Sequence, residues 1–312
     1  MEVSVKGRMN SADVPVTKRH TKSRYYLFAY ALIAPAMILV AVLILYPLLD
    51  AIYTSLTASS FIQPVPKFVG LRNYLNMFSS PVFWQVVLNS FYWTVAVVVA
   101  QLVIGILVAL LLNMKFYGRA LLRVIVILPW VMPGIIAGMI WKLMYDPYLG
   151  TINTWLLRLG LIHNYVAWLS QPSTVLPSLI IAAIWKGAPF SVLMYLAALQ
   201  SVSKDSIEAS MIDGASPWRR LINVVIPEIS PTIRTTILLT TVWTFNYFDL
   251  IYVTTQGGPG HYSQIFPTYI YNLAFVKVQY GLASAYGVIS IIILLVFSVF
   301  YVRELNKARV FE

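Results

Sequence analysis

The sequence contains no cysteine and few charged residues. Without cysteine the chain has neither disulfides nor thiolate metal sites. Only 11% of its 312 residues are charged, whereas soluble domains average roughly a quarter. The mean hydropathy is +0.77. A chain of this composition is expected to place most of its surface in lipid.

Residue patterns for catalysis and nucleotide binding are missing as well. His20, His163 and His261 are the only histidines, and all three lie outside the long apolar segments, so a hydrolase nucleophile there would lack a base. The sequence has no Gly-x-x-x-x-Gly-Lys-Ser/Thr loop and no cluster of histidines or carboxylates. We therefore expect no catalytic residue, cofactor or metal in this chain, and any ATP and magnesium to be bound by another chain.

Six apolar segments have the roughly 20 residues that a helix needs to cross a membrane. They are Tyr26–Leu49, Val86–Met114, Val124–Tyr145, Val175–Gln200, Ile233–Thr255 and Leu282–Val302. Pro129 and Pro133 interrupt the third segment, and Pro177 and Pro189 interrupt the fourth, which indicates a packed bundle with an irregular path. The sequence thus predicts an all-α integral membrane protein whose transmembrane domain covers residues 25–303.

The basic residues predict the orientation of these segments. Sixteen Lys and Arg residues fall on one side of the membrane, in or next to the tails 1–24 and 304–312 and two loops, and five fall on the other. Because short cytosolic loops carry the excess of Lys and Arg, both termini are predicted to be cytosolic. The net charge of +11 follows from this topology, so nucleic acid is not an expected partner.

The cytosolic segment of about residues 201–230 has the pattern of two short helices. Asp205 and Glu208 have the spacing of a capping box at the start of the first helix. Gly214 is the expected stop, and Ser216-Pro217 is the expected start of the second helix.

The second helix carries an apolar face and is expected to end at Pro227. The face consists of Trp218, Leu221, Ile222 and Val225. Such a face can insert into a groove of a partner protein or lie on lipid, and the pattern alone leaves both interpretations open.

The string from Glu208 to Arg220, followed by Ile226-Pro227, closely resembles the EAA loop of permeases from binding-protein-dependent ABC importers. In that family Glu-Ala-Ala precedes Asp-Gly-Ala, and Ser210 replaces the third small residue here. Four more strings resemble motifs of sugar permeases in the same order: residues 68–74, 150–153, 185–190 and 248–259. The chain is most similar to the MalF-like carbohydrate permeases.

The resemblance implies the six-helix bundle of a type I ABC importer permease in a bacterial inner membrane. It implies as partners a second permease chain, two ATPase subunits and an extracytoplasmic solute-binding protein, besides the membrane lipid. Coupling to the ATPase falls on Glu208, Ala209, Asp213 and Gly214.

The resemblance also implies a solute path along the fourth and fifth apolar segments. The matching positions are Gly187, Phe190, Thr240, Trp243, Thr244 and Tyr247. The four from 240 to 247 share one helical face, where an aromatic ring and hydroxyls suit a sugar, although such a stripe also suits helix packing. Lys186 and Asp249 are charged residues within the segments. The family has amide side chains at two positions occupied here by Thr244 and Tyr247, so the motif does not specify the sugar.

The predicted function is therefore the permease subunit of an ATP-driven carbohydrate importer. A permease for another polar solute, such as a glycerol phosphate, is an alternative. A self-powered secondary transporter is the other alternative, but it would show inverted repeats, and the two halves of this sequence do not match.

Overall fold

The computed structural model describes residues 20–60 and 66–310. It divides into an N-terminal unit, Met1–Asp50, and a main unit, Ala51–Glu312, which are described separately. The described residues are helical apart from turns and one isolated antiparallel bridge between Thr57 and Phe68, which confirms the predicted all-α class. Most of the predicted tail 1–24, and the last two residues of the predicted tail 304–312, lie outside the described residues.

The N-terminal unit consists of one long apolar helix whose end belongs to the main unit. Helix α1 (His20–Val40) continues through a π-helical turn, Ala41–Leu45, into α2 (Tyr46–Ser55). Its stretch Ala29–Ser55 is 27 residues long, enough to cross a membrane. This agrees with the first predicted segment and extends it at the C-terminal end.

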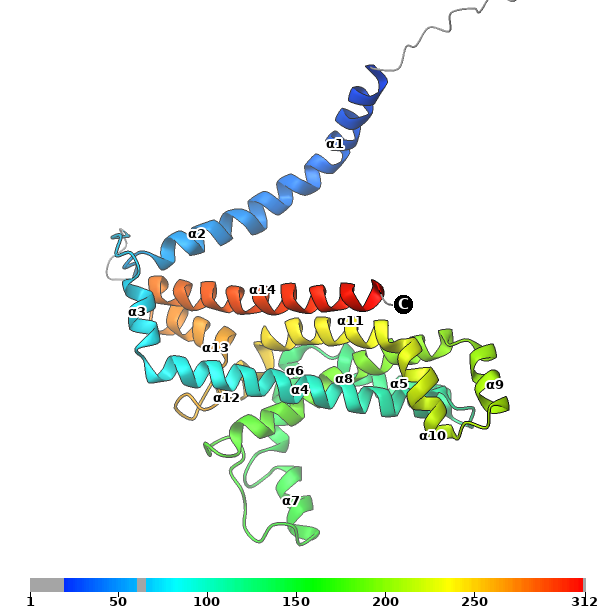
Figure 1. Ribbon diagram of the computed structural model, residues 1–312. Coiled ribbons are helices and arrows are strands. Elements are labelled where there is room, and N and C mark those ends of the chain that lie inside the picture. The colour runs from blue at the N-terminus through cyan, green and yellow to red at the C-terminus, as the bar shows by residue number, and fades with distance from the viewer. Residues whose placement is uncertain (1–19, 61–65, 311–312) are drawn as a thin grey trace, which may run out of the picture. The chain divides into compact units, whose positions relative to one another are not determined.

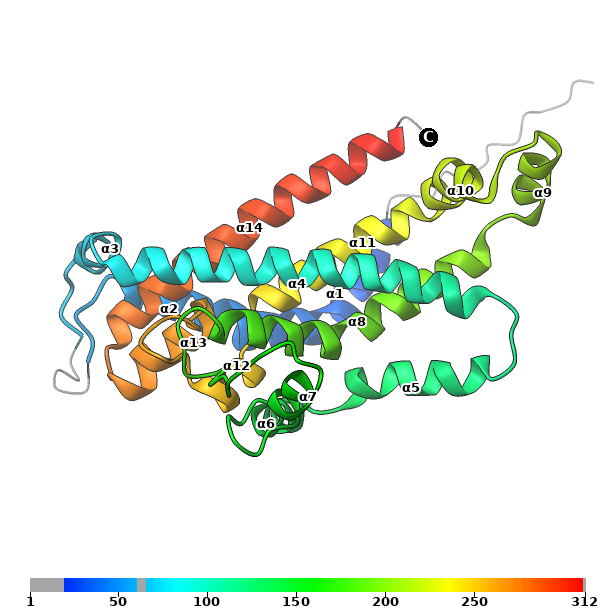
Figure 2. The same cartoon turned by 90° about the horizontal axis from the view of Figure 1, so that it is seen from below.

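The main unit is a bundle in which α4, α8 and α14 run in one direction while α5 and α11 run back (Figures 1 and 2). Its helices are α3 (Arg72–Phe78), α4 (Pro81–Asn113), α5 (Arg119–Val131), α6 (Gly134–Met144), α7 (Thr151–Arg158), α8 (Val175–Ser201), α9 (Lys204–Ile212), α10 (Pro217–Arg220), α11 (Ile226–Phe245), α12 (Asp249–Thr255), α13 (Phe266–Tyr271) and α14 (Tyr280–Val310).

The packing of α4 against α8 forms the centre of this bundle. Gly105 of α4 lies against Ser191 and Tyr195 of α8, and a Cβ atom at position 105 would come within 2.7 Å of the Ser191 Cβ. Gly187 of α8 lies in the same way against Gln101 of α4. Small residues at such contacts let two membrane helices approach closely, so each helix supplies one glycine to the contact.

Three buried apolar clusters follow one another along α4. The first includes Phe83, Phe266 and Tyr286, the second Trp93, Trp141 and Leu250, and the third Leu112, Tyr195 and Ile229. Each cluster joins α4 to helices distant in the sequence, so α4 is the common wall of the core.

Four described helices are long and apolar enough to cross a membrane, and the bent pair α5 and α6 would make a fifth. The four single helices correspond to the predicted segments Tyr26–Leu49, Val86–Met114, Val175–Gln200 and Leu282–Val302. Helix α8 is uninterrupted although it contains Pro177 and Pro189. Pro177 lies in its first turn, where a missing N–H leaves no intrahelical bond unmade.

The third predicted segment, Val124–Tyr145, is not one helix. It divides into α5 and α6, whose axes differ by 98°. Met132 precedes Pro133 and has extended backbone angles, because proline disfavours the helical conformation in the residue before it. Pro129 stays inside α5 and does not break it.

The fifth predicted segment, Ile233–Thr255, is also not one helix. Helix α11 ends at Phe245, and the chain passes through residues 246–248 before α12 begins. The apolar length of the segment predicts a continuous helix here and does not reveal this break.

Pro227 does not end a helix, contrary to the sequence-based prediction. A π-helical turn over Leu221–Val225 connects α10 to α11, and Ile226 N–H donates to the Leu221 carbonyl across the wide turn. The next residue is Pro227, which has no N–H to donate. The turn Ala41–Leu45 is built in the same way before Pro47, with Tyr46 N–H bonded to the Ala41 carbonyl. In both places the wider turn carries the helix into a proline.

The loops between α6 and α8 are held together by buried Asn153. Its Nδ2 donates to the carbonyls of Pro147 and Val166 at 2.8 and 2.9 Å. Its Oδ1 accepts from Trp168 Nε1 at 2.8 Å and from Val166 N–H at 3.4 Å. Nearby, Asp146 accepts the N–H groups of Leu149 and Tyr148, which lowers the pKa of its carboxyl. These turns are therefore ordered by side chains.

Replacing Asn153 with Leu is expected to lower the thermal stability of the purified protein. The similar-sized apolar side chain would leave four partly buried polar groups without partners, at about 1 kcal/mol each. The midpoint of thermal unfolding should fall by several degrees. Asn164→Leu, an exposed asparagine in the same connection, is the control and should shift the midpoint little. Equal shifts in the two variants would contradict the role of Asn153.

Candidate functional site

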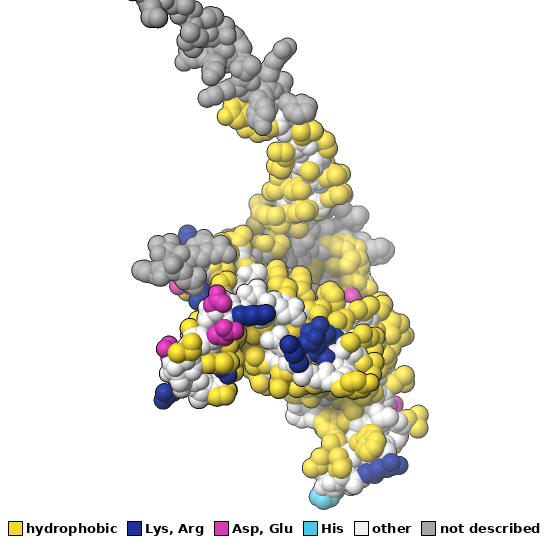
Figure 3. All heavy atoms as spheres, turned by 90° about the vertical axis from the view of Figure 1, so that its right-hand side faces the viewer, with side chains coloured by type: hydrophobic (Ala, Val, Ile, Leu, Met, Phe, Trp, Pro, Cys, Tyr) yellow, Lys and Arg dark blue, Asp and Glu magenta, His cyan; other side chains and the backbone are white. Residues whose placement is uncertain are grey.

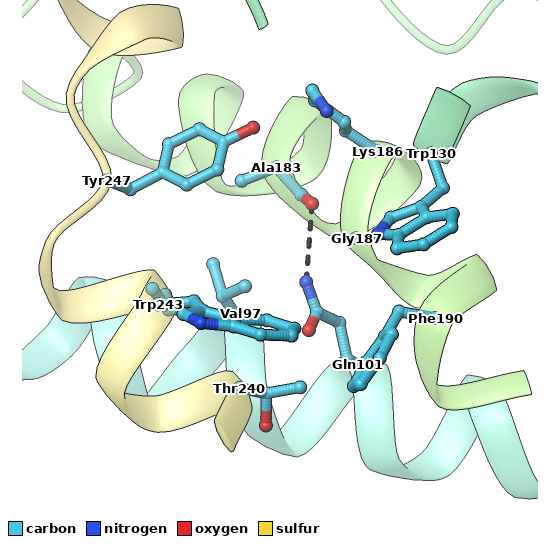
Figure 4. Close-up of a pocket in the computed structure, with 11 residues that line it drawn as sticks. Val97, Gln101, Trp130, Ala183, Lys186, Gly187, Phe190, Thr240, Trp243 and Tyr247 are labelled. Atoms are coloured by element: carbon cyan, nitrogen blue, oxygen red, sulfur yellow. Dashed lines mark hydrogen bonds between the residues drawn. The ribbon is translucent and has the colours of Figure 1, made fainter. Parts of the chain in front are cut away.

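A cavity of about 100 Å³ lies where α4, α8 and α11 meet (Figure 4). We call it the central cavity. Its walls are Val97, Gln101, Trp130, Ala183, Lys186, Gly187, Phe190, Thr240, Trp243, Thr244 and Tyr247. Since a water molecule takes about 30 Å³, the cavity has room for only a few waters in this conformation.

All six residues predicted for the solute path line the central cavity. Gly187 and Phe190 come from α8, while Thr240, Trp243 and Thr244 come from α11. Tyr247 was predicted on the same helical face, but α11 ends before it, and it reaches the cavity from the turn that follows. Segments more than 40 residues apart in the sequence are thus brought to one place.

Gly187 lines the cavity because it makes room for an amide. A Cβ atom at position 187 would overlap the side-chain amide of Gln101. Gln101 is buried, and its Nε2 donates to the Ala183 carbonyl at 3.4 Å. The sequence analysis did not single out Gln101, although an amide in the middle of a long apolar segment is a signal for a functional position.

Aromatic rings form one side of the cavity. The Phe190 ring meets Trp243 edge-on with 4.8 Å between centroids, and Trp130 lies 6.0 Å away on its other side. Trp243 is 50% exposed, so its ring is not part of the packed core. Trp130 was also not predicted, and no sequence pattern connects it with Phe190.

Trp93 attaches the cavity end of α11 to α4. It is fully buried, and its indole N–H donates to the Thr244 carbonyl at 2.9 Å. Its ring also lies 6.0 Å from that of Tyr247. The position of Thr244 and Tyr247 at the cavity therefore depends on a residue that does not line it.

Some polar groups at the cavity have hydrogen-bond partners within the protein, and others do not. The Thr240 hydroxyl donates within α11 to the Thr236 carbonyl at 2.8 Å. The Tyr247 hydroxyl is buried without a hydrogen-bond partner among the described residues, and Figure 4 shows it directed toward the wall near Ala183 and Lys186. A buried hydroxyl without a partner costs about 1–3 kcal/mol. A bound solute or water could remove that cost, so this hydroxyl favours a polar occupant.

The first helix of the segment 201–230, α9, is capped by a different residue than predicted. Ser203 caps α9, because its side chain accepts the Ser206 N–H at 3.4 Å, whereas Asp205 lies inside the first turn. The predicted capping box of Asp205 and Glu208 is therefore wrong. A serine hydroxyl at the cap accepts a free N–H of the first turn as an aspartate carboxylate would.

The predicted stop and second start are both confirmed. Gly214 has φ of +73° and ends α9 in a Schellman motif, in which the N–H groups of Gly214 and Ala215 bond to the carbonyls of Met211 and Ser210. Ser216 caps α10 by accepting the Arg219 N–H at 3.3 Å, and Pro217 occupies the first helical position.

The segment is anchored to the bundle at its base. Glu228 of α11 accepts the backbone N–H of Ser203 at 2.8 Å, which links the first turns of α9 and α11. Ile207 and Val225 pack against the third buried cluster at the ends of α4 and α8. Glu228 lies outside the EAA pattern, and no sequence signal pointed to its role.

The far side of the segment is exposed. Glu208, Ala209, Asp213 and Gly214 are all exposed, and so are the apolar side chains of Met211, Ile212 and Trp218, with Ile212 at 87% and Trp218 at 68%. The predicted stripe of Trp218, Leu221, Ile222 and Val225 is split. Ile222 is exposed while Leu221 and Val225 are half-buried, because the π-helical turn changes the helical spacing there.

Both helices that hold this segment also line the central cavity. Helix α8 runs from Phe190 to its end at Ser201, about 17 Å at 1.5 Å per residue. Helix α11 runs about 20 Å from Pro227 to Thr240. The exposed segment and the cavity are therefore joined by two continuous helices.

Comparisons with known proteins show the family of this chain. A family model described as the inner membrane component of binding-protein-dependent transport systems matches residues 101–311. A probable ABC transporter permease of Brucella suis is 36% identical over 280 residues, which cover 90% of this chain and 97% of that protein. The trehalose/maltose transport system permease MalF of Thermococcus litoralis is 34% identical over 282 residues, with coverage of 90% and 95%.

A solved structure extends the similarity to the fold. A chain from a bacterial ABC transporter involved in the import of the acidic polysaccharide alginate aligns with a TM-score of 0.78 and 26% identity, and the alignment covers 91% of this chain and 96% of that one. With the family model matching more than half of its residues, this chain belongs to the inner membrane permeases of binding-protein-dependent ABC transporters.

Proposed function

We propose that this permease moves a carbohydrate into the cytosol and receives it from an extracytoplasmic binding protein. The observation that carries the proposal is the central cavity, which collects all six path residues between the two helices that hold the segment 201–230. The Thermococcus relative belongs to a trehalose and maltose transport system, which supports a sugar as the solute.

The proposed topology has six crossings with both termini in the cytosol. Helices α5 and α6 together make the third crossing, and α11 and α12 the fifth, within a transmembrane domain of residues 25–303. The 16 to 5 distribution of Lys and Arg supports this orientation. Figure 3 shows the end of the main unit where α9 and α10 lie, with a cluster of Lys and Arg side chains on it.

In the proposed mechanism the segment 201–230 docks into a cleft of an ATPase subunit. The exposed Met211, Ile212 and Trp218 would enter the cleft, with Glu208, Ala209, Asp213 and Gly214 around them. Movement of the ATPase subunits would then displace α9. The Glu228 link and the third buried cluster would transmit that displacement to α8 and α11 and so to the cavity walls.

The remaining partners follow from this mechanism. The complex would contain a second permease chain and two ATPase subunits, which bind the ATP and magnesium. This chain itself would hold no cofactor, catalytic residue, metal or nucleic acid. The family's description as binding-protein-dependent supports an extracytoplasmic binding protein as the source of the solute.

The cavity suits weak and reversible sugar binding. Trp243 and Phe190 would contact the C–H face of a sugar ring, while the Tyr247 hydroxyl and the Gln101 amide would meet its hydroxyls. Each such contact contributes about 1 kcal/mol, which allows release into the cytosol. The cavity must widen to admit a sugar, which is consistent with walls that belong to separate helices.

Lys186 supports a second candidate, a solute with an acidic group. Lys186 lines the cavity and is half-buried, and the solved relative imports the acidic polysaccharide alginate. A glycerol phosphate or an acidic sugar would place its anion near this ammonium group. Competition of labelled-solute uptake by neutral and acidic compounds would distinguish the two candidates.

Replacing Glu208 with Lys is expected to abolish uptake while the chain still folds, because Glu208 is exposed and its loss removes no packing. Less ATPase subunit should co-purify with the variant. Asp205→Lys makes the same charge change on α9 at a position without an assigned role, and it should retain most of the uptake. Full ATPase yield together with normal transport by the Glu208 variant would refute the coupling assignment.

Replacing Trp243 with Ala is expected to reduce uptake severalfold or change the solute preference, while complex yield and basal ATPase activity persist. The reason is that Trp243 is half-exposed and faces the cavity. Trp93→Ala is the contrasting variant. Trp93 is fully buried, and its loss should cost about 3–5 kcal/mol and lower yield and activity together. If Trp243→Ala behaves like Trp93→Ala, Trp243 serves packing and not the solute.

A further inference from the structure

A second gap of about 240 Å³ lies between the end of α4, the start of α5 and the end of α8. Most of its wall is aliphatic, including Leu112, Val126, Val192 and Leu196, and Arg123 and Gln200 are its polar residues. An ordered water needs two to four polar partners, and this wall offers few. The gap is therefore better suited to a hydrocarbon chain than to water.

Arg123 gives the gap a positive charge that the protein only partly satisfies. Its Nη2 donates to the Leu112 carbonyl at 3.3 Å, which caps one free carbonyl at the end of α4. Its Nε is buried without a partner among the described residues. Capping α4 thus accounts for one of the five N–H donors of the guanidinium, and no carboxylate of the described residues pairs with it.

The location matches the headgroup region of a bilayer. Figure 2 shows the turn between α4 and α5 at the same end of the main unit as α9 and α10, the end that the proposed orientation makes cytosolic. Lys115 and Arg119 lie in or beside this turn, and Arg119 also bonds to a carbonyl at the end of α4. Basic residues at this depth attract acidic lipids of the cytosolic leaflet.

We propose that this gap binds an acidic phospholipid. The phosphate accepts hydrogen bonds from the Arg123 guanidinium, and part of one acyl chain lies against the aliphatic wall between α5 and α8. The proposal rests on the orientation given above and not on the identity of the solute. The site would lie at the contact of α5 with α8.

The test compares lipids on the full-length permease in its complex. Native mass spectrometry would measure binding of phosphatidylglycerol, phosphatidylcholine and soluble glycerol phosphate. Phosphatidylglycerol should bind about tenfold more tightly than phosphatidylcholine. Both lipids offer a phosphate to Arg123, but the choline ammonium of phosphatidylcholine cancels the negative charge and is repelled by the basic turn. Soluble glycerol phosphate should bind far more weakly, since it lacks an acyl chain. Binding of glycerol phosphate as tight as that of the lipid would overturn the lipid assignment.

Two variants locate the site. Arg123→Gln removes the charge and should abolish the preference for phosphatidylglycerol. Ala197→Phe fills the gap from an exposed position on α8, so it should weaken lipid binding even if Arg123→Gln folds poorly. Lys115→Gln changes an exposed charge in the same turn that does not line the gap, so it should weaken binding much less than Arg123→Gln does. Equal effects of the Arg123 and Lys115 variants, or unchanged binding by Ala197→Phe, would contradict the proposal.

Discussion

The close contact of α4 with α8 is the constraint on which the other features depend. Gly105 and Gly187 each face the other helix. A side chain at position 105 would meet the Ser191 Cβ and push the two helices apart, and one at position 187 would displace the Gln101 amide. In lipid there is little hydrophobic gain from helix association, so packing of this kind has to hold the pair together. The contact also encloses the Gln101 amide, which is buried beside the cavity and uses the Ala183 carbonyl as its partner. A bulkier residue at 187 would thus disturb both the bundle and the cavity wall.

The position of α11 follows from this pair. Trp93 of α4 bonds to the Thr244 carbonyl, which places the end of α11 against α4, and Thr236, Thr240 and Thr244 are buried along the contact. At the other end Glu228 bonds to Ser203 just after α8. Helix α11 is therefore attached at two points, Thr244 beside the cavity and Glu228 beside the exposed segment, which are about 24 Å apart at 1.5 Å per residue. In the proposed mechanism, a displacement of the segment would reach the cavity most directly along this helix.

Much of this arrangement could be predicted from the sequence, because the relevant signals are local. Apolar length identified the long helices, and Gly214 and Ser216-Pro217 identified the turn between α9 and α10. The path residues came from motif resemblance, and they do meet at one cavity. What sequence reasoning missed depends on contacts between distant segments. The sequence around Glu228 does not indicate that its carboxylate bonds to Ser203. Likewise, the sequence around Trp130 does not indicate that its ring packs near Phe190 at the cavity.

The breaks in the helices also depend on more than the local sequence signals. The sequence pattern predicts that a helix ends at Pro227, but a π-helical turn carries the helix past this proline. At Pro133, in contrast, the helix does break. Proline removes an N–H in every case, and the neighbouring turn decides whether the helix continues. The interruption at residues 246–248 contains no proline at all. Tyr247 therefore reaches the cavity from the turn after α11, and a helical-wheel projection of α11 cannot predict this position.

The central claim is that nucleotide-driven movement of the segment 201–230 reaches the central cavity through α8 and α11. The cysteine-free chain allows a direct measurement, in which Thr244→Cys reports on the cavity and Ser170→Cys, in an exposed loop, is the control. The labelling rate of each single cysteine with a water-soluble maleimide is measured in the assembled complex, without nucleotide and after trapping with ATP and vanadate. The account predicts a severalfold change in rate at position 244 and none at position 170. The same rate at position 244 in both states would contradict it.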